Sequence, residues 1–327
     1  MMRKVRGVTL IELMISMAIG LILAAAASYM FLTSQRIYKT IDTRGQQQET
    51  AAIVLDFIGR DLKNAGFYPA TFPTTAAVPG YYGQYSNIVP STPVAYNQGV
   101  FGCSNAVFDP NASPPACPAA VSGAPDSLVV NYFSSDDFTV EGVGSRSDCL
   151  RGSVNTVTYN ISRAGVGATN TSTVALPVFI TNIYSLGSAT TLALDKQSVS
   201  TRSFRCAGNS SSGNHRPLFS GVEELRLRYG VSDGTTIEAP ARFHTAAEVN
   251  ALSALVVGGV SKTGWQRVVS VQVCIVTKTL DNSVRQTATG TYLNCDNTAV
   301  SYTTADRSIY QRSIRTFGLR NNLTGTF

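Results

Sequence analysis

The sequence predicts an α+β protein in which one long N-terminal helix precedes a β-rich globular domain. Two observations carry this prediction. An apolar run at residues 8–32 continues without proline into an amphipathic pattern that ends near Gly66, and short runs rich in Val, Ile, Tyr and Phe follow it between turn residues. We expect the apolar half of the helix to lie in a membrane and the amphipathic half to pack on an antiparallel sheet.

The composition is typical of a secreted β-rich domain without strong charge. Of the 327 residues, 44% are hydrophobic and 14% are charged, and the 26 Lys and Arg exceed the 20 Asp and Glu to give a net charge of +6. Three of these cations, Arg3, Lys4 and Arg6, lie at the N-terminus. The remaining excess is small and scattered, so it does not argue for a nucleic-acid partner.

The N-terminus combines a basic leader with an apolar segment. Residues 1–7 read MMRKVRG, and the run 8–32 is long enough to cross the roughly 30 Å hydrocarbon core once as a helix. The positive flank should stay cytoplasmic, which predicts a single-pass inner-membrane protein whose C-terminal domain is periplasmic. One acidic residue, Glu12, lies inside the run, although a carboxylate costs on the order of 2.5–3.5 kcal/mol at the centre of a membrane helix.

The stretch GVTLIEL, residues 7–13, resembles the class III signal of type IV prepilins and type II secretion pseudopilins. The resemblance implies that a prepilin peptidase cleaves after Gly7, that the new amino terminus at Val8 is methylated, and that residues 8–66 remain as the pilin helix. The usual residue after the cut is Phe, and Val8 departs from that pattern. An uncleaved signal anchor with a chance glutamate is the alternative.

Glu12 is the candidate assembly residue. Removal of the leader leaves the charged amino group of Val8 at the edge of the bilayer core, where Glu12 of a neighbouring subunit can neutralise it and fix the axial stagger between subunits. Alternatively, Glu12 favours its own helix dipole from the first turns of the mature helix. The two roles are compatible, and the intermolecular one explains assembly.

The helical pattern continues to about residue 65. Charged residues, Asp61 among them, take the faces that the apolar residues leave, and Gly66 is a natural stop. Gly45 and Gly59 each lower helix propensity by about 1 kcal/mol relative to Ala, which makes bends or a short break plausible. The apolar positions recur at three- and four-residue steps: Ala51, Val54, Leu55, Ile58, Leu62 and Ala65.

Beyond the helix we expect a domain over 67–327, either in one piece or as two lobes that meet near 205–217. Loops rich in Pro, Gly, Ser and Asn are expected at 69–96 and 207–217. A short helix is expected over 244–256, with Thr245 and Glu248 as a capping box. The runs that we expect to form strands are 127–133, 154–161, 174–180, 225–231, 268–277 and 308–317.

Six cysteines follow the apolar segment, and none forms a CxxC pair. An even number after an export signal favours disulfides in an oxidising compartment, although six cysteines allow about 15 connectivities. Free buried thiols are the alternative, and zinc is disfavoured because the spacings are wide. We expect bridges between sequence neighbours, namely Cys103–Cys117, Cys149–Cys206 and Cys274–Cys295.

Four further segments, 52–69, 221–231, 265–279 and 310–323, together resemble PilW-type minor pilins of type IVa systems. The resemblance implies a low-abundance type IV pilus subunit that joins other minor pilins and the major pilin through its N-terminal helix. Its implied role is to prime assembly and sit at the pilus tip, in support of adhesion or twitching motility. A large tip adhesin of the PilY family is a further implied partner.

Two other classes of function stay open from the sequence. A pseudopilin J-like subunit of type II secretion shares the N-terminus, although this chain is long for one. A membrane-anchored periplasmic enzyme or binding module requires a convergent polar pocket, yet no GxSxG surrounds a serine near His215 or His244. No catalytic residue, metal ligand set or cofactor is expected, and the cluster Asp136, Asp137 and Glu141 is interpreted as a solvated loop.

The mature protein should begin at N-methylated Val8, because Gly7 is the small residue that separates the basic leader from the apolar run. Edman degradation or mass analysis of the mature protein tests this. Retention of Met1, or a start beyond Leu32, would contradict the prepilin interpretation. Gly7→Ala should be cleaved better than a variant with a bulky residue, because the peptidase must seat a small side chain.

Overall fold

The computed structural model divides the chain into two compact units, Met1–Gln46 and Gln47–Phe327. Gly7 and Val8 lie outside the described residues, and so does the loop expected at 69–96. The structure describes residues 9–67, 98–133, 148–152, 158–162, 171–175, 179–192, 198–209, 213–234, 239–257, 259–280, 289–303 and 306–322.

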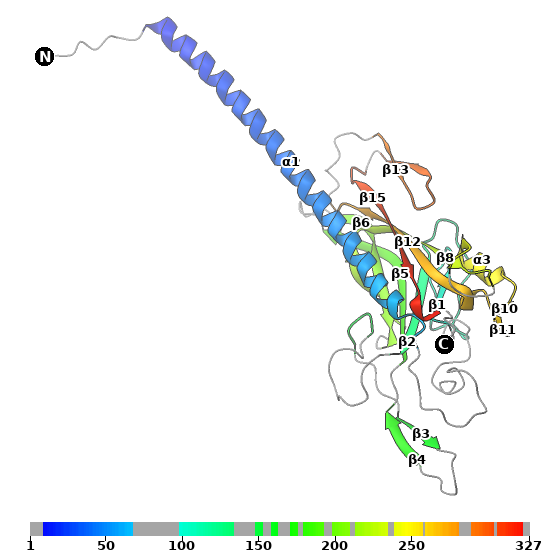
Figure 1. Cartoon of the computed structure of the whole chain (residues 1–327). Coiled ribbons are helices and arrows are strands. Elements are labelled where there is room, and N and C mark those ends of the chain that lie inside the picture. Colours follow the sequence, from blue (N-terminus) through cyan, green and yellow to red (C-terminus); the bar gives the residue numbers. More distant parts are fainter. Residues whose placement is uncertain are drawn as a thin grey trace. The chain divides into compact units, whose positions relative to one another are not determined.

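The first element is helix α1, Leu10–Asn64 (Figure 1). It carries Glu12 in its first turn and Lys63 in its last, and both charges are favourable for the helix dipole. The helix continues through the two glycines at which bends or a break were plausible. It stops before Gly66, as predicted: this residue has a φ of 71°, and its N–H donates to the carbonyl of Asn131 at 2.9 Å.

The second unit contains a five-stranded antiparallel sheet with the strand order β1-β2-β5-β6-β7. Along its long central hairpin, formed by β5 and β6, the pairing runs from Asn182 opposite Gly208 to Leu192 opposite Ser198. The strands are β1 (Val100–Cys103), β2 (Ser127–Phe133), β5 (Phe179–Leu192), β6 (Ser198–Gly208) and β7 (Arg216–Ser220).

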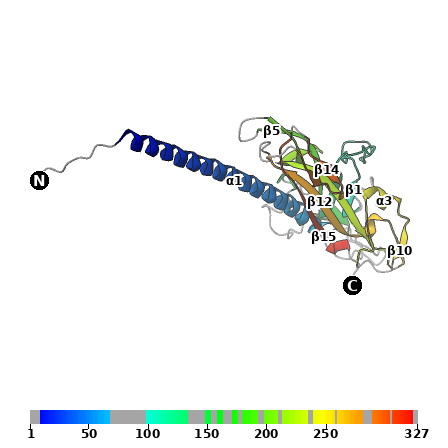
Figure 2. The same ribbon diagram turned by 90° about the horizontal axis from the view of Figure 1, so that it is seen from above.

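A second antiparallel sheet follows, with the strand order β15-β12-β8-β9. Its strands are β8 (Val222–Val231), β9 (Arg242–His244), β12 (Val268–Lys278) and β15 (Tyr310–Gly318). Strand β12 lies between β8 and β15, and Figure 2 shows it beside β15. It is buried along most of its length, as its run of Val and Ile residues predicts.

Small elements complete the second unit. Helix α3 (Ala246–Ala251) has the predicted capping box, in which Thr245 and Glu248 exchange hydrogen bonds, but it ends five residues before the expected limit. Short 3-10 helices occur at η3 (Trp265–Arg267) and η4 (Arg320–Asn322). Three two-stranded ribbons are formed by β3 (Thr158–Ser162) with β4 (Thr171–Ala175), β10 (Leu255–Val257) with β11 (Val260–Lys262), and β13 (Thr291–Leu293) with β14 (Ala299–Ser301).

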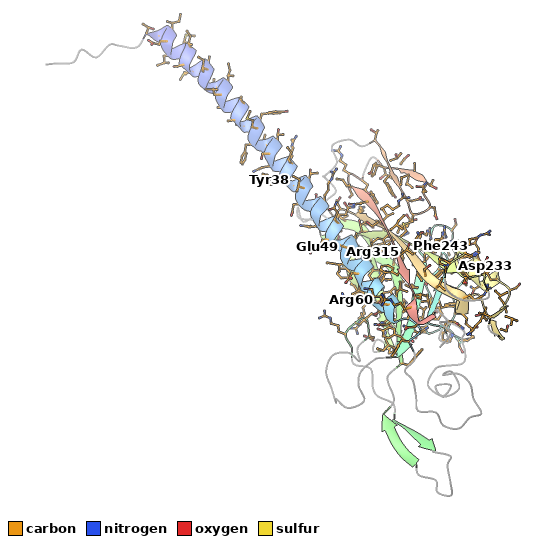
Figure 3. All side chains as sticks on the ribbon, in the orientation of Figure 1. Tyr38, Glu49, Arg60, Asp233, Phe243 and Arg315 are labelled. Atoms are coloured by element: carbon orange, nitrogen blue, oxygen red, sulfur yellow. A yellow bond between two sulfur atoms is a disulfide. The ribbon has the colours of Figure 1, made fainter. Side chains whose placement is uncertain are left out.

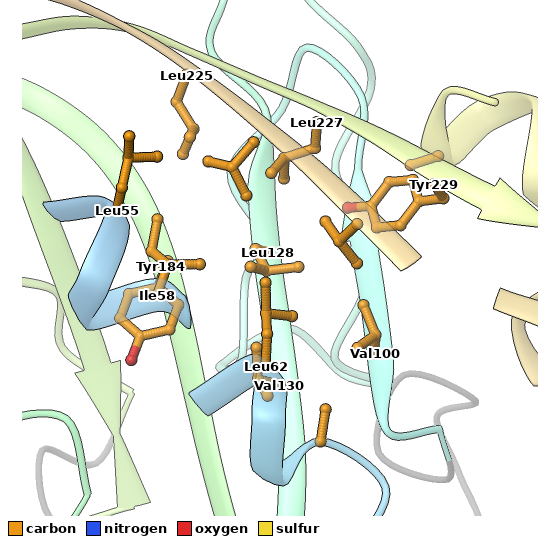
Figure 4. Close-up of a cluster of buried hydrophobic side chains, with 14 of the residues drawn as sticks. Leu55, Ile58, Leu62, Val100, Leu128, Val130, Tyr184, Leu225, Leu227 and Tyr229 are labelled. Atoms are coloured by element: carbon orange, nitrogen blue, oxygen red, sulfur yellow. The ribbon is translucent and has the colours of Figure 1, made fainter. Parts of the chain in front are cut away.

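The amphipathic half of α1 supplies the centre of the core. Ile58 and Leu62 are fully buried and gather with Leu128 and Val130 of β2 and Tyr184 of β5 (Figure 4). Burying an aliphatic side chain of this size stabilises the fold by about 1.5–3 kcal/mol relative to leaving it exposed. All six predicted apolar positions of this half are buried in the same cluster: Ala51, Val54, Leu55, Ile58, Leu62 and Ala65.

Four of the six predicted strands are confirmed. The runs 127–133, 225–231, 268–277 and 308–317 are confirmed as β2, β8, β12 and β15, with ends that differ by at most three residues. The run 174–180 includes the end of β4 and the start of β5, and residues 176–178 between them lie outside the described residues. The run 154–161 coincides with β3 over residues 158–161, and its first four residues lie outside the described residues. Strand β6 was missed, because Ser, Thr and Arg interrupt its apolar residues.

The region 205–217, in which a seam between two lobes was considered, includes the paired ends of β6 and β7, which belong to one sheet. The division of the domain into two lobes therefore stays a prediction.

Three disulfides link the cysteines of the second unit. They join Cys103 to Cys117, Cys149 to Cys206, and Cys274 to Cys295. These are the neighbour pairs that we expected, and each closes before the next begins. The third holds the turn between β13 and β14 onto β12, an inner strand of the second sheet.

Gly59→Ala should destabilise the domain, because a Cβ atom there would meet the ring of Phe317 on β15. We expect the loss from overpacking, about 1–3 kcal/mol, to exceed the roughly 1 kcal/mol gain in helix propensity. Urea unfolding of the purified protein measures the change. Gly45→Ala is the matched control, because a Cβ at Gly45 meets nothing within 4 Å. An equal effect of the two variants would contradict the packing argument.

Candidate functional site

The first half of α1 is an exposed apolar helix. Every described side chain from Thr9 to Lys39 is exposed, and Glu12 is the only charged residue between positions 9 and 32. The helix is long and apolar enough to cross a membrane by length and composition. The N-terminal apolar helix thus provides the membrane anchor that the sequence predicts.

Three hydroxyl groups of this half are satisfied within the helix. Ser16 donates to the carbonyl of Leu13 at 2.9 Å, and Ser28 and Thr33 donate to the carbonyls four residues before them at 2.8 and 2.9 Å. Such back-bonding lets a helix carry Ser and Thr through an apolar medium without an external partner. Within residues 9–32, the carboxylate of Glu12 is the charged group that requires a partner from elsewhere.

Glu12 lies in the first turn of the helix. Its backbone N–H donates to the carbonyl of Thr9 at 3.1 Å and lies 3.4 Å from the hydroxyl oxygen of the same residue, so Thr9 begins the helix. This position supports the dipole role of the carboxylate. None of the described side chains forms an ion pair or a hydrogen bond with it, so the pairing with Val8 stays a prediction.

The second half of α1 begins with a buried amide that holds it to the second sheet. Gln47 is 4% exposed, and its Nε2 donates to the carbonyl oxygens of Thr277 at 2.6 Å and Ile309 at 3.0 Å. These two carbonyls belong to the end of β12 and to the residue before β15. One side chain therefore fixes the helix where two strands of the sheet meet.

A partly buried carboxylate holds the same half to the first sheet. Asp61 accepts hydrogen bonds from Tyr184 Oη at 2.5 Å, Asn182 Nδ2 at 2.5 Å and Tyr132 Oη at 3.1 Å. The donors lie on β2 and β5. We expected Asp61 on a polar face of the helix; that expectation was wrong, because three buried donors on the sheet replace the water around the carboxylate.

The burial of this cluster alters its titration. Desolvation raises the pKa of Asp61 above its ordinary value, against the hydrogen bonds from Tyr184, Asn182 and Tyr132 and the charge of Arg60, which lower it. Desolvation and the nearby carboxylate likewise raise the pKa values of Tyr184 and Tyr132, so both phenols keep their protons and remain donors. The cluster is therefore sensitive to pH through Asp61 alone.

The C-terminal end of α1 is closed by a side chain from the far end of the sequence. Asn321 Nδ2 lies 3.4 Å from the carbonyl oxygens of Lys63 and Asn64 and donates to that of Ala65 at 3.1 Å. The last carbonyls of a helix have no partner inside it, so such an amide is an effective cap. Residues of α1 from Gln47 onward are thus fixed at the start, at Asp61 in the last turn and at the C-terminal carbonyls.

The two histidines lie beside different polar side chains. His215 Nδ1 lies 2.9 Å from Ser185 Oγ, and His244 lies 3.9 Å from Glu248 on helix α3. Among the described residues, no group of three His, Cys, Asp or Glu side chains is placed to hold a metal ion. The acidic cluster at residues 136–141 lies outside the described residues.

Two family models match the chain, one at each end. The prokaryotic N-terminal methylation motif matches residues 2–28, and the type IV pilus-assembly protein W model matches residues 184–321. The chain is a type IV pilin of the PilW type. Comparison with curated proteins and with solved structures finds no match.

The two matches cover different parts of the pilin. The first includes Glu12 and the apolar half of α1, and the second extends from β5 to Asn321. Neither includes Gln47 or Asp61, which hold the helix to the two sheets. The two matches together support a type IV pilus minor pilin, a structural subunit that works with other pilus components.

Asp61→Asn should gain stability relative to the wild-type pilin as the pH rises from about 4 to 7. Because the pKa of Asp61 is raised, the folded protein holds this proton more tightly than the unfolded chain. That stabilisation is full below the ordinary value of 3.8 and is lost as the pH rises through the folded pKa. Denaturant unfolding of both proteins across this range measures the difference.

The matched control is Asp56→Asn, which changes an exposed carboxylate on the same helix. It removes the same charge from the helix and leaves the contacts with Tyr184, Asn182 and Tyr132 intact. A wild-type advantage over Asp61→Asn that grows with pH would mean that the three hydrogen bonds outweigh burial and that the pKa direction is wrong.

Proposed function

We propose that this pilin helps to initiate assembly of a type IV pilus and sits at the pilus tip within a complex of minor pilins. The observation that carries the proposal is the match of an N-terminal methylation motif and a pilus-assembly model on one chain. The pilus-assembly match also favours a pilus over a type II secretion system, in which a pseudopilin would have the same kind of N-terminus.

The N-terminal helix has one role before assembly and another after it. Residues 1–7 are a leader that a prepilin peptidase removes after Gly7, and Val8 becomes the methylated amino terminus. The apolar helix then stays in the inner membrane with the domain on the periplasmic side. After assembly, the same helix packs against the helices of the major pilin and the other minor pilins.

Charge neutralisation between subunits drives the docking step. The exposed apolar half of α1 contains one charged side chain, and the hydroxyl groups of Ser16, Ser28 and Thr33 are already satisfied. The carboxylate of Glu12 and the amino group of Val8 on a neighbour are therefore the two polar groups that gain from pairing. Removing one member of such a pair costs about 3–5 kcal/mol when it is fully buried, and less at a bilayer edge that water reaches.

The tip location follows from the two different surfaces of a filament subunit. In a head-to-tail filament each subunit offers one surface to the neighbour before it and another to the neighbour after it. A subunit that starts the filament uses one of these surfaces for growth. The other is left for a tip adhesin of the PilY family, through which the complex would support adhesion or twitching motility.

Glu12→Ala and Glu12→Gln should both block assembly while membrane insertion and leader cleavage proceed. Glu12→Gln retains size and hydrogen bonding, so its failure would assign the effect to charge. Even about 1.4 kcal/mol weakens docking tenfold. The measurements are copurification with the other minor pilins from detergent-solubilised membranes and a count of surface filaments at equal protein level.

Ser16→Ala is the control, because it removes a polar group from the same helix without changing its charge. It should assemble normally. Normal complexes and piliation in both Glu12 variants would mean that the carboxylate serves its own helix.

A further inference from the structure

Strand β15 is a long and regular edge of the second sheet. It pairs with β12 through nine consecutive residues, from Tyr310 opposite Lys278 to Gly318 opposite Ser270, without a bulge. Among the described residues, no strand lies on its other side. A strand with one free edge presents a row of backbone donors and acceptors to which another strand can add.

The register identifies which backbone groups face this free edge. Two hydrogen bonds flank the ladder, from Leu319 N to Val269 O at 2.8 Å and from Thr279 N to Ile309 O at 3.0 Å. In an antiparallel pair, residues that bond to the partner alternate with residues that do not. The odd-numbered residues of β15 therefore bond to β12, and the even-numbered residues direct their N–H and C=O groups outward.

The middle of this edge is exposed and partly apolar. Ile314, Arg315 and Thr316 are all exposed, and Arg315 is labelled in Figure 3. The apolar side chain of Ile314 is 48% exposed. Two of the three, Ile314 and Thr316, are even-numbered. Exposed backbone groups and an exposed isoleucine thus coincide at the same point of the strand.

The other edges of the two sheets are protected in ways that β15 is not. Strands β1 and β9 have four and three residues, and β7 contains Pro217 beside an irregularity in its pairing with β6. Short strands, proline and bulges are the usual means by which proteins prevent edge pairing. Of the edges in these two sheets that the structure describes, β15 is the one suited to accept a strand.

The charge of β15 selects its partner. The strand contains two arginines, Arg312 and Arg315, and no acidic residue, and Arg320 follows it. Arg312 is held by Asn294 O at 3.2 Å and Asn297 Oδ1 at 3.0 Å, while Arg315 and Arg320 are exposed. A second copy of β15 would bring like charges into one ladder, which is unfavourable, whereas an acidic strand would be attracted.

We infer that β15 is a docking edge that accepts an acidic edge strand of another pilin subunit in the same assembly. The inference rests on the proposed function for the identity of the partner. Backbone hydrogen bonds at the even-numbered residues provide the attachment, and the arginines provide the preference for an acidic strand.

Hydrogen exchange tests the inference on the full chain. The pilin is purified in detergent, alone and in its assembly with the other minor pilins, and exchange is measured residue by residue over 310–318. In the pilin alone, the amides of Ile314 and Thr316 should exchange fast and those of Ser313 and Arg315 slowly. In the assembly, the exchange of Ile314 and Thr316 should slow at least tenfold.

Charge reversal supplies the second measurement. Arg315→Glu should weaken retention in the assembly by about tenfold, because it opposes the acidic partner. Arg242→Glu is the matched control, since it makes the same change at an exposed arginine of β9. A photo-crosslinker at position 316 should attach to an acidic segment of another subunit.

The outcomes separate the two proposals. If the assembly forms but the amides of Ile314 and Thr316 exchange as in the isolated pilin, the docking edge is wrong and the proposed function stands. Crosslinking at position 316 to a second copy of this chain also overturns the acidic partner. If no assembly forms with wild-type pilin, both proposals fail.

Discussion

The structure depends on the packing of one amphipathic helix against two sheets. Residues from Gln47 to Asn64 of α1 bury an apolar stripe against β2 and β5 on one side and against the second sheet on the other. Polar contacts at Gln47, Asp61 and Asn321 fix its register, since each satisfies groups that would otherwise be buried without partners. Neither sheet has a complete core without this helix.

The apolar part of this arrangement was readable from the sequence. The i, i+3, i+4 spacing placed Ile58 and Leu62 in the core, and the β-branched run of β12 marked the central strand. The class III signal and the PilW-type segments led to the family that the two models identify. The spacing of apolar residues was therefore enough to predict these core positions of α1 and the buried strand β12.

The polar contacts were not readable, because their partners are distant in sequence. Asp61 is satisfied by residues more than 70 positions away, and Gln47 by carbonyls at residues 277 and 309. A charged residue on a helix predicts solvent unless buried donors are known to surround it. Strand β6 was missed for a related reason: its place between β5 and β7, and not its composition, makes it a strand.

The order of the disulfides has a consequence for biosynthesis. Because Cys103–Cys117, Cys149–Cys206 and Cys274–Cys295 each close before the next begins, every cysteine finds its partner among those that have already emerged or are next to emerge. An oxidant that joins thiols in order of appearance produces the native set directly. Such a chain does not depend on later reshuffling by an isomerase, which takes seconds to hours.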